Sequence, residues 1–192
     1  QSSNGKLTVN ASYEKVPSIN FDFLMQKNIK LKIRIPESYD KEIDIDNNMG
    51  DIYAKGSFTK AKLVVDLGDI ISEIDAQYLE VYTNSGSSKI SGKINSSNIE
   101  SDMGDISYKP VLNESGEHIL KTDLGIINLE LESESNVTVE ARISVGDIIN
   151  EFRFSNIINN ERKDSASHFV AYNGKGESKI NIESDTGEIN IK

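Results

Sequence analysis

The sequence predicts an all-β protein, a right-handed parallel β-solenoid of about eight turns with an N-terminal β cap. Three observations predict this fold. A five-residue motif, Asp-Leu-Gly-Asp-Ile at residues 66–70, returns along the chain with small changes. Apolar residues stand at fixed distances from each motif glycine, and apolar and polar residues alternate around it. Repeats of about 20 residues with this alternation are typical of stacked β coils.

The motif glycines mark the corners between strands, because glycine accepts the positive φ of a sharp turn. Their spacing is 18 residues three times, 21 twice and 41 once. The last interval predicts a hidden copy, in which His168 occupies the glycine slot and Val170 takes the place of Ile52. Parallel crossovers almost always wind right-handed, which predicts the hand. The predicted structural corners are Gly50, Gly68, Gly86, Gly104, Gly125, Gly146 and Gly187.

Residues 1–40 precede the first corner and are predicted to form N-terminal cap strands. Apolar residues alternate at Leu7 and Val9, through 19–23, and again from Ile29 to Ile35. Strands in these segments would cover the open edge of the first coil, which could otherwise pair with another chain.

Residues 41–192 are predicted to form the solenoid, in a single domain with the cap. The repeats run from 41 to 150 without a linker, and the segment 110–117 lengthens one turn. Residues 151–168 are the least regular part, with a polar loop expected at 159–165. Residues 175–192 close the array.

Composition excludes several classes of partner and site. The 192 residues carry a formal charge of −10 and no basic run, which argues against nucleic acid or an anionic membrane surface. No cysteine is present, so disulfides and thiolate chemistry are excluded. No apolar run is long enough to span a membrane. Because the chain begins at Gln1, we expect a leader or membrane anchor to have preceded it.

Three segments carry a resemblance to a known family: Ile33-Arg34-Ile35-Pro36, then Ile43-Asp44-Ile45, then Gly50-Asp51-Ile52 with its later copies. From about residue 30 to 192 the chain resembles the bacterial "putative adhesin" family, a domain of unknown function. The resemblance implies a β-solenoid fold and a place on the outer side of the membrane, behind a signal or anchor. It implies no catalytic residues.

Acidic residues recur beside the corners and suggest two interpretations. Stacked coils would bring carboxylates of neighbouring turns together, and calcium prefers such oxygen ligands. The chain has one glycine per corner, however, whereas calcium-binding solenoid repeats have several. We favour turn chemistry and assign no cofactor, with calcium as the alternative. The weak calcium candidates are Asp51, Asp69, Asp105 and Asp147.

Aromatic residues in the irregular segment predict a binding patch, because insertions in repeat proteins often lie on the binding face. Its candidate members are Phe152, Phe154, His168, Phe169 and Tyr172. The other histidine, His118, lies seven residues before Gly125, at a position that holds Leu79 in an earlier repeat, and is expected to be a packed or edge histidine.

The favoured function is a non-enzymatic, extracytoplasmic surface or scaffold module that binds a protein or glycan. Self-association through the solenoid ends is also expected. The alternative is a polysaccharide-cleaving enzyme, because parallel β-helices host such activities. No catalytic residue is assigned, since no Gly-x-Ser-x-Gly elbow occurs and Asp185-Thr186-Gly187 matches a corner.

Overall fold

The computed structural model describes residues 2–3, 6–7, 31–36, 38–112 and 115–192. These residues form strands, turns and irregular backbone without a helix, which confirms the all-β prediction. Within them there is accordingly no helical segment that could cross a bilayer. The chain divides into two compact units, Gln1–Pro36 and Glu37–Lys192.

The first unit contains one antiparallel pair of short strands, β1 (Ser2–Ser3) and β2 (Lys6–Leu7). Residues 31–36 are not in a strand, although their alternation predicts one. The remaining cap residues of the sequence prediction, including Val9, 19–23 and Ile29, lie outside the described residues. The cap over the first coil therefore stays a prediction.

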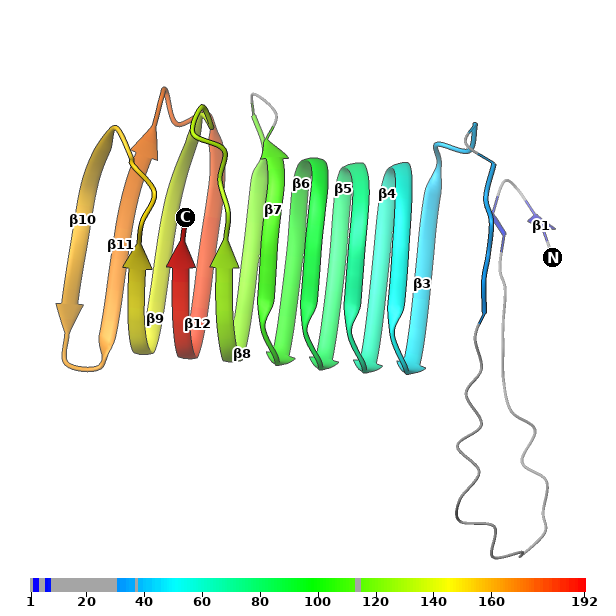
Figure 1. The fold of residues 1–192 in the computed structure, drawn as a ribbon, viewed down its shortest axis with the longest axis horizontal. Helices are drawn as coiled ribbons and strands as arrows, with labels where there is room; N and C mark the ends of the chain where they lie inside the picture. Colours follow the sequence, from blue (N-terminus) through cyan, green and yellow to red (C-terminus); the bar gives the residue numbers. More distant parts are fainter. Residues whose placement is uncertain (1, 4–5, 8–30, 37, 113–114) are drawn as a thin grey trace, which may run out of the picture. The chain divides into compact units, whose positions relative to one another are not determined.

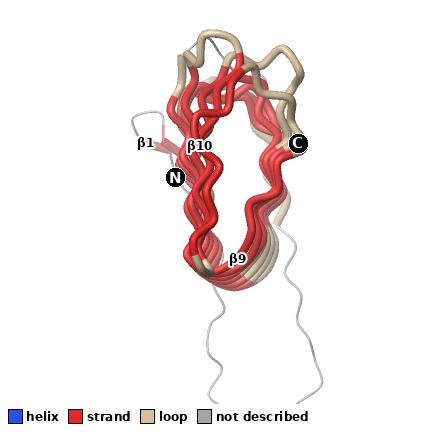
Figure 2. The backbone as a smooth tube through the Cα atoms, turned by 90° about the vertical axis from the view of Figure 1, so that its left-hand side faces the viewer, coloured by secondary structure: helices blue, strands red, loops and turns tan. Residues whose placement is uncertain are grey.

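The second unit is a ten-stranded, mostly parallel sheet that coils on itself. Along the stack the strands follow the order β10-β11-β9-β12-β8-β7-β6-β5-β4-β3 (Figure 1). Seen along the stack, the coils superpose into a flattened ring (Figure 2). The strands are β3 (Glu42–Met49), β4 (Ile52–Leu67), β5 (Ile70–Ser85), β6 (Ser88–Met103), β7 (Ile106–Leu112), β8 (Glu117–Leu129), β9 (Val137–Asn150), β10 (Asn156–Lys163), β11 (Ala166–Asn173) and β12 (Ser178–Ile191).

The repeat length sets the register between neighbouring coils. Leu63 of β4 pairs with Val81 of β5, 18 residues later, and Val81 pairs with Ile99 of β6. Ile99 pairs with Leu120 of β8 across the lengthened turn, a shift of 21 residues. All four side chains are buried. The row of apolar residues five positions before each glycine is therefore a continuous column of the narrow core, as the sequence predicts.

The C-terminal strand is inserted into the stack rather than added at its end. β12 pairs in parallel with β8 on one side and with β9 on the other. Gly187 consequently lies between Gly125 and Gly146. Sequential stacking, which the repeat spacing suggests, is wrong here, because every coil presents the same glycine and apolar rows and accepts any other as its neighbour.

The hidden copy around His168 is also wrong. β11 runs antiparallel to β9, with His168 opposite Arg142 and Phe169 opposite Ala141. The backbone N–H of Gly146 donates a hydrogen bond to the carbonyl oxygen of Ser165, at 2.9 Å, so Ser165 and not His168 lies beside this corner. The expected polar loop at 159–165 largely forms strand β10, which pairs with β11 through backbone groups and so needs no apolar side chains. Alternation alone does not reveal strand direction.

Candidate functional site

The glycine corners form a column in which, at every corner except Gly50, an added Cβ would meet the backbone of a neighbouring coil. Each of these glycines has a positive φ, for example +146° at Gly86. A Cβ built on Gly86 would lie 1.9 Å from the carbonyl oxygen of Gly68 in the preceding coil. Gly104, Gly125, Gly146 and Gly187 meet the same obstacle from the carbonyl oxygen of a neighbouring corner glycine, at 1.8–2.1 Å. The corner thus selects glycine both for its φ and for close backbone stacking.

The aspartates that follow Gly50, Gly68 and Gly104 connect successive coils. Asp51 accepts a hydrogen bond at Oδ1 from the backbone N–H of Asp69, at 3.0 Å. Asp69 accepts one in the same way from Ser87, and Asp105 from Ile126, both at 2.8 Å. Asp147 instead pairs with Arg162 of β10. The recurring Asp is therefore explained by backbone hydrogen bonding between coils.

A second acidic row lies two residues before the glycines. Asp66 accepts a hydrogen bond from Asn48 at 3.0 Å, and Asp102 accepts one from Tyr82 at 2.8 Å. Both donors are side chains of the preceding coil, whereas the sequence suggests bonds to the local backbone. Asp123 and Asp185 continue this row and are exposed.

Between the two acidic rows runs a line of exposed apolar side chains, which we name the corner row. Its members precede the glycines: Met49 pairs with Leu67, Met103 with Leu124, and Thr186 with both Leu124 and Val145. Ser85 connects Leu67 to Met103. In stacking order the corner row is Met49, Leu67, Ser85, Met103, Leu124, Thr186 and Val145, and its five apolar members are 50–74% exposed.

Sequence reasoning missed the corner row, although its signal is in the repeated motif. Leu67 and Met103 each stand between an aspartate and a glycine, in Asp-Leu-Gly-Asp and Asp-Met-Gly-Asp. Alternation with the buried Val65 would place Leu67 inside the coil, but the sharp corner turns it outward, where it is 51% exposed. Only the backbone path through the corner reveals this exposure.

The calcium candidates do not form a chelating cluster. No group of three or more acidic or histidine side chains suited to a metal ion occurs among the described residues. Asp51, Asp69 and Asp105 each use Oδ1 for a backbone N–H of the next coil. Asp147 pairs with Arg162. The geometry of these four residues is that of structural connections.

The predicted aromatic patch is mostly packed at the end of the core. Phe169 is 1% exposed, so its ring cannot contact a ligand, which corrects its place in the patch. Phe154 packs between Phe169 and Phe152, with ring centroids 5.7 and 4.8 Å apart. Phe152 and Phe154 are half-buried against the core. The rings fill the interior where the regular coils end.

The polar members of that patch are held by their neighbours. His168 contacts Glu140 through Nε2 and Asn159 through Nδ1, each at 3.0 Å. The hydroxyl of Tyr172 accepts a hydrogen bond from Asn156 at 3.3 Å. These contacts join β9, β10 and β11, and His168 lies on a strand rather than in a corner.

A buried polar cluster lies inside the coils. His118 is fully buried, as the sequence predicts, and its Nδ1 lies 3.0 Å from Ser97 Oγ and 2.9 Å from the Tyr108 hydroxyl. Burial lowers the pKa of His118 to about 4 and raises the pKa of Tyr108. Nε2 of His118 is buried and has no hydrogen-bond partner among the residues that the structure describes. Ser97 is 2% exposed, so this serine–histidine pair is closed to a substrate.

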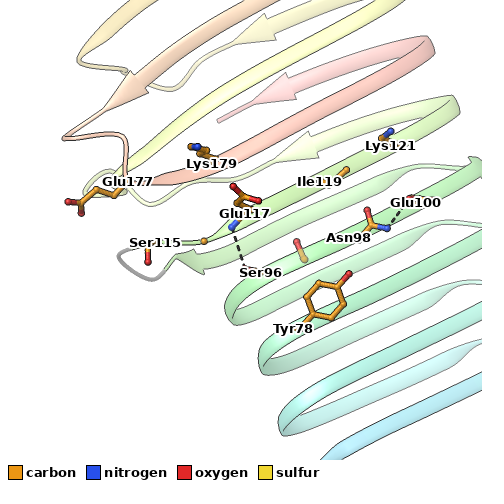
Figure 3. A pocket seen from close by; sticks show the side chains of 12 residues that line it. Tyr78, Ser96, Asn98, Glu100, Ser115, Glu117, Ile119, Lys121, Glu177 and Lys179 are labelled. Atoms are coloured by element: carbon orange, nitrogen blue, oxygen red, sulfur yellow. Dashed lines mark hydrogen bonds between the residues drawn. The ribbon is translucent and has the colours of Figure 1, made fainter.

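An open depression of about 790 Å³ lies on one face of the coils (Figure 3). Tyr78, Asn98 and Ile119 form part of its wall, and it carries both signs of charge. The charged side chains are Glu100, Glu117, Lys121, Glu177 and Lys179. Lys121 is paired with Glu183 at 3.0 Å.

The family comparison agrees with this architecture. A family model described as Toastrack DUF4097 matches residues 1–112 and 60–192. A solved structure of a "putative cell adhesion protein" from Clostridium sporogenes aligns over 84% of this chain and 96% of its own, with 12% identity and a TM-score of 0.44. No curated protein matches the sequence.

Proposed function

The chain belongs to the Toastrack DUF4097 family, and from that premise we propose that it is a non-enzymatic binding module on the outer side of the cell membrane. Its coils act as a stiff scaffold, and the corner row with its acidic flanks is the face that meets a partner. The outward location follows from the adhesin-like resemblance of residues 30–192. The proposal includes the finer fold prediction of about eight right-handed turns.

The single observation that carries the proposal is the exposure of the corner row. Met49 is 74% exposed, and Leu67, Met103 and Leu124 are 51–53% exposed. Soluble proteins scatter single apolar residues over the surface, whereas continuous apolar patches mark interaction sites. Here strand register aligns the apolar residues in one line, interrupted by Ser85 and Thr186, so a partner can contact them together.

Burial of the serine–histidine pair supports a binding role over catalysis. A polysaccharide-cleaving enzyme needs accessible acid and base groups in a cleft. Ser97 and His118 are enclosed in the core, and the acidic residues beside the corners engage neighbouring coils. The Ser97–His118 pair therefore gives the enzymatic alternative no support.

Two screens on the purified chain test the proposal. Acidic and neutral polysaccharides are assayed for cleavage, and glycan and peptide arrays are assayed for binding. We expect no turnover, and we expect binding that is lost when Leu67, Met103 and Leu124 are all changed to serine. Clear turnover, or array binding that is insensitive to these changes, would contradict the proposal. Protease treatment of intact cells that carry a tagged chain tests the outward location.

A further inference from the structure

The corner row has a charge pattern that selects its partner. Asp66, Asp102, Asp123 and Asp185 lie on one side of it, interrupted by Asn48, Asn84 and Ser144. On the other side lie Asp51, Asp69, Asp105, Asp147 and Glu188, interrupted by Ser87 and Ile126. No lysine or arginine occurs in these rows, in the glycine column or in the corner row itself, although Arg162 of β10 pairs with Asp147. The corner is thus an apolar line between two acidic lines.

We propose that the corner row binds a basic amphipathic segment of another polypeptide, one with an apolar stripe bordered by lysine or arginine. This inference rests on the proposed function and adds the chemical class of the partner. Apolar side chains of the segment would cover Met49, Leu67, Met103, Leu124 and Val145. Its basic side chains would pair with the flanking carboxylates, and burial beside apolar groups strengthens such pairs relative to water.

The dimensions of the corner suit a helix. Neighbouring strands in a sheet are about 4.8 Å apart, so seven coils extend over about 29 Å. An α-helix rises about 1.5 Å per residue, so about 19 residues cover that length. The corner row continues along the stack through β12, which lies between β8 and β9. Apolar residues at three- and four-residue spacing form the matching stripe on a helix.

Charge also argues against the other occupants of an exposed apolar row. A second copy of this chain would bring its own acidic flanks against these, and the chain already carries a formal charge of −10. An anionic lipid surface would be repelled for the same reason. A basic segment is attracted at long range, and this attraction weakens as salt shortens the screening length.

Two carboxylates allow the charge to be tested apart from folding. Asp123 and Asp185 make no hydrogen bond to another described residue, whereas Asp51, Asp69 and Asp105 hold neighbouring coils together. Asp123→Asn with Asp185→Asn therefore removes charge from one flank and keeps the coil connections. Leu67→Ser with Met103→Ser and Leu124→Ser removes the apolar line. Serine is the natural residue of this row at Ser85.

The test uses the full chain and three synthetic 18-residue peptides in fluorescence anisotropy. The first peptide has leucines in one helical stripe with lysine on both borders. The second replaces each lysine with glutamate, and the third scrambles the first sequence so that no stripe forms. The apolar control variant is Tyr53→Ser with Ile157→Ser and Ile158→Ser, three residues that are 49–72% exposed outside the corner row.

We expect the lysine peptide to bind at least about tenfold more tightly than the other two. The glutamate peptide has the wrong charge, and the scrambled peptide has no apolar stripe. The triple serine variant should weaken binding at least about tenfold, because it removes three apolar contacts. The Asp123→Asn and Asp185→Asn variant should weaken it and reduce its salt dependence. The apolar control variant should bind like the unmodified chain.

Three results would overturn the inference. Equal binding of the lysine and scrambled peptides would indicate general charge attraction, and binding of the chain to phosphatidylcholine vesicles would assign the row to a membrane. Failure of the lysine peptide to bind would reject a basic partner. In that case the glycan and peptide arrays separate the two proposals. If the triple serine variant loses the array binding of the unmodified chain, the corner row remains the contact face. If the variant binds the arrays like the unmodified chain, that face is rejected as well.

Discussion

His118 makes the stability of the fold depend on pH. The folded chain keeps this buried side chain neutral, with its pKa lowered to about 4, whereas the unfolded chain protonates it near its ordinary pKa of 6.5. The unfolded state therefore binds more protons between these two pH values. The free energy of unfolding consequently decreases as the pH falls from about 6.5 to about 4. The shift corresponds to roughly 3 kcal/mol.

The His118→Leu variant tests this dependence by urea unfolding at pH 7 and pH 4.5. Leu79 occupies the same position two coils earlier, and Ser97 still donates to Tyr108, at 3.1 Å, when the histidine is gone. We expect the variant to lose less stability than the unmodified chain between the two pH values. An equal loss in both would show that carboxylates alone cause the acid sensitivity.

Gly86 and Gly50 separate the two reasons for glycine at the corners. Both have a positive φ, which costs an alanine about 1–3 kcal/mol. A Cβ on Gly86 would also lie 1.9 Å from the carbonyl oxygen of Gly68, whereas a Cβ on Gly50 meets nothing closer than Asn47 at 3.6 Å. Gly86→Ala should therefore reduce the free energy of unfolding by at least about 2 kcal/mol more than Gly50→Ala. Similar losses in thermal unfolding would mean that the stacked backbone is not the constraint.

At the scale of the strands, the position of β12 can be tested with engineered disulfides in this cysteine-free chain. Asn190 of β12 pairs with Asn128 of β8, and their side chains are joined by a hydrogen bond of 3.2 Å. A disulfide needs Cα atoms within about 7 Å of each other. We expect Asn128→Cys with Asn190→Cys to crosslink under mild oxidation, as measured by gel mobility and mass spectrometry.

The matched control is Asn128→Cys with Ile149→Cys. These positions would be neighbours if the coils stacked in sequence order, but β12 separates them, because Asn190 pairs with both Asn128 and Ile149. Two strand spacings are about 9.6 Å, too far for a disulfide. Crosslinking in the control pair and not in the first pair would show that β9, and not β12, lies beside β8.

At the scale of the whole molecule, the end of the stack offers an edge for self-association. β10 is the terminal strand of the sheet and, among the described strands, pairs only with β11. Ile157 and Ile158 on it are 49% and 63% exposed. An exposed edge strand with apolar residues can pair with the same strand of a second copy, and proteins prevent such pairing with lysine at the edge.

We expect sedimentation velocity to detect dimers that increase with salt, because salt screens the repulsion between two chains of charge −10. Ile158→Lys should lower the dimer fraction several-fold, and Tyr53→Ser, on an inner coil, should leave it unchanged. Dimers that persist in Ile158→Lys would place the contact elsewhere.

The coiled path of the chain follows from local features of the sequence. Glycine at a fixed spacing requires a recurring sharp turn, and the apolar residues five before it, from Leu63 to Leu120, have no other place than a shared interior. It also placed His118 at a strand position that holds the buried Leu79 in an earlier repeat. These properties are local, since they depend on backbone conformation and on alternation within one repeat.

The stacking order of the coils, and the side chains that face outward at the corner, are visible only in the folded structure. Nearly identical rows make the coils interchangeable as neighbours, so spacing could not place β12 between β8 and β9. Alternation is the same in both strand directions, so it could not show that β11 runs antiparallel. The exposure of Leu67 and Met103 depends on the path of the backbone through the corner, and with it the surface proposed here for binding.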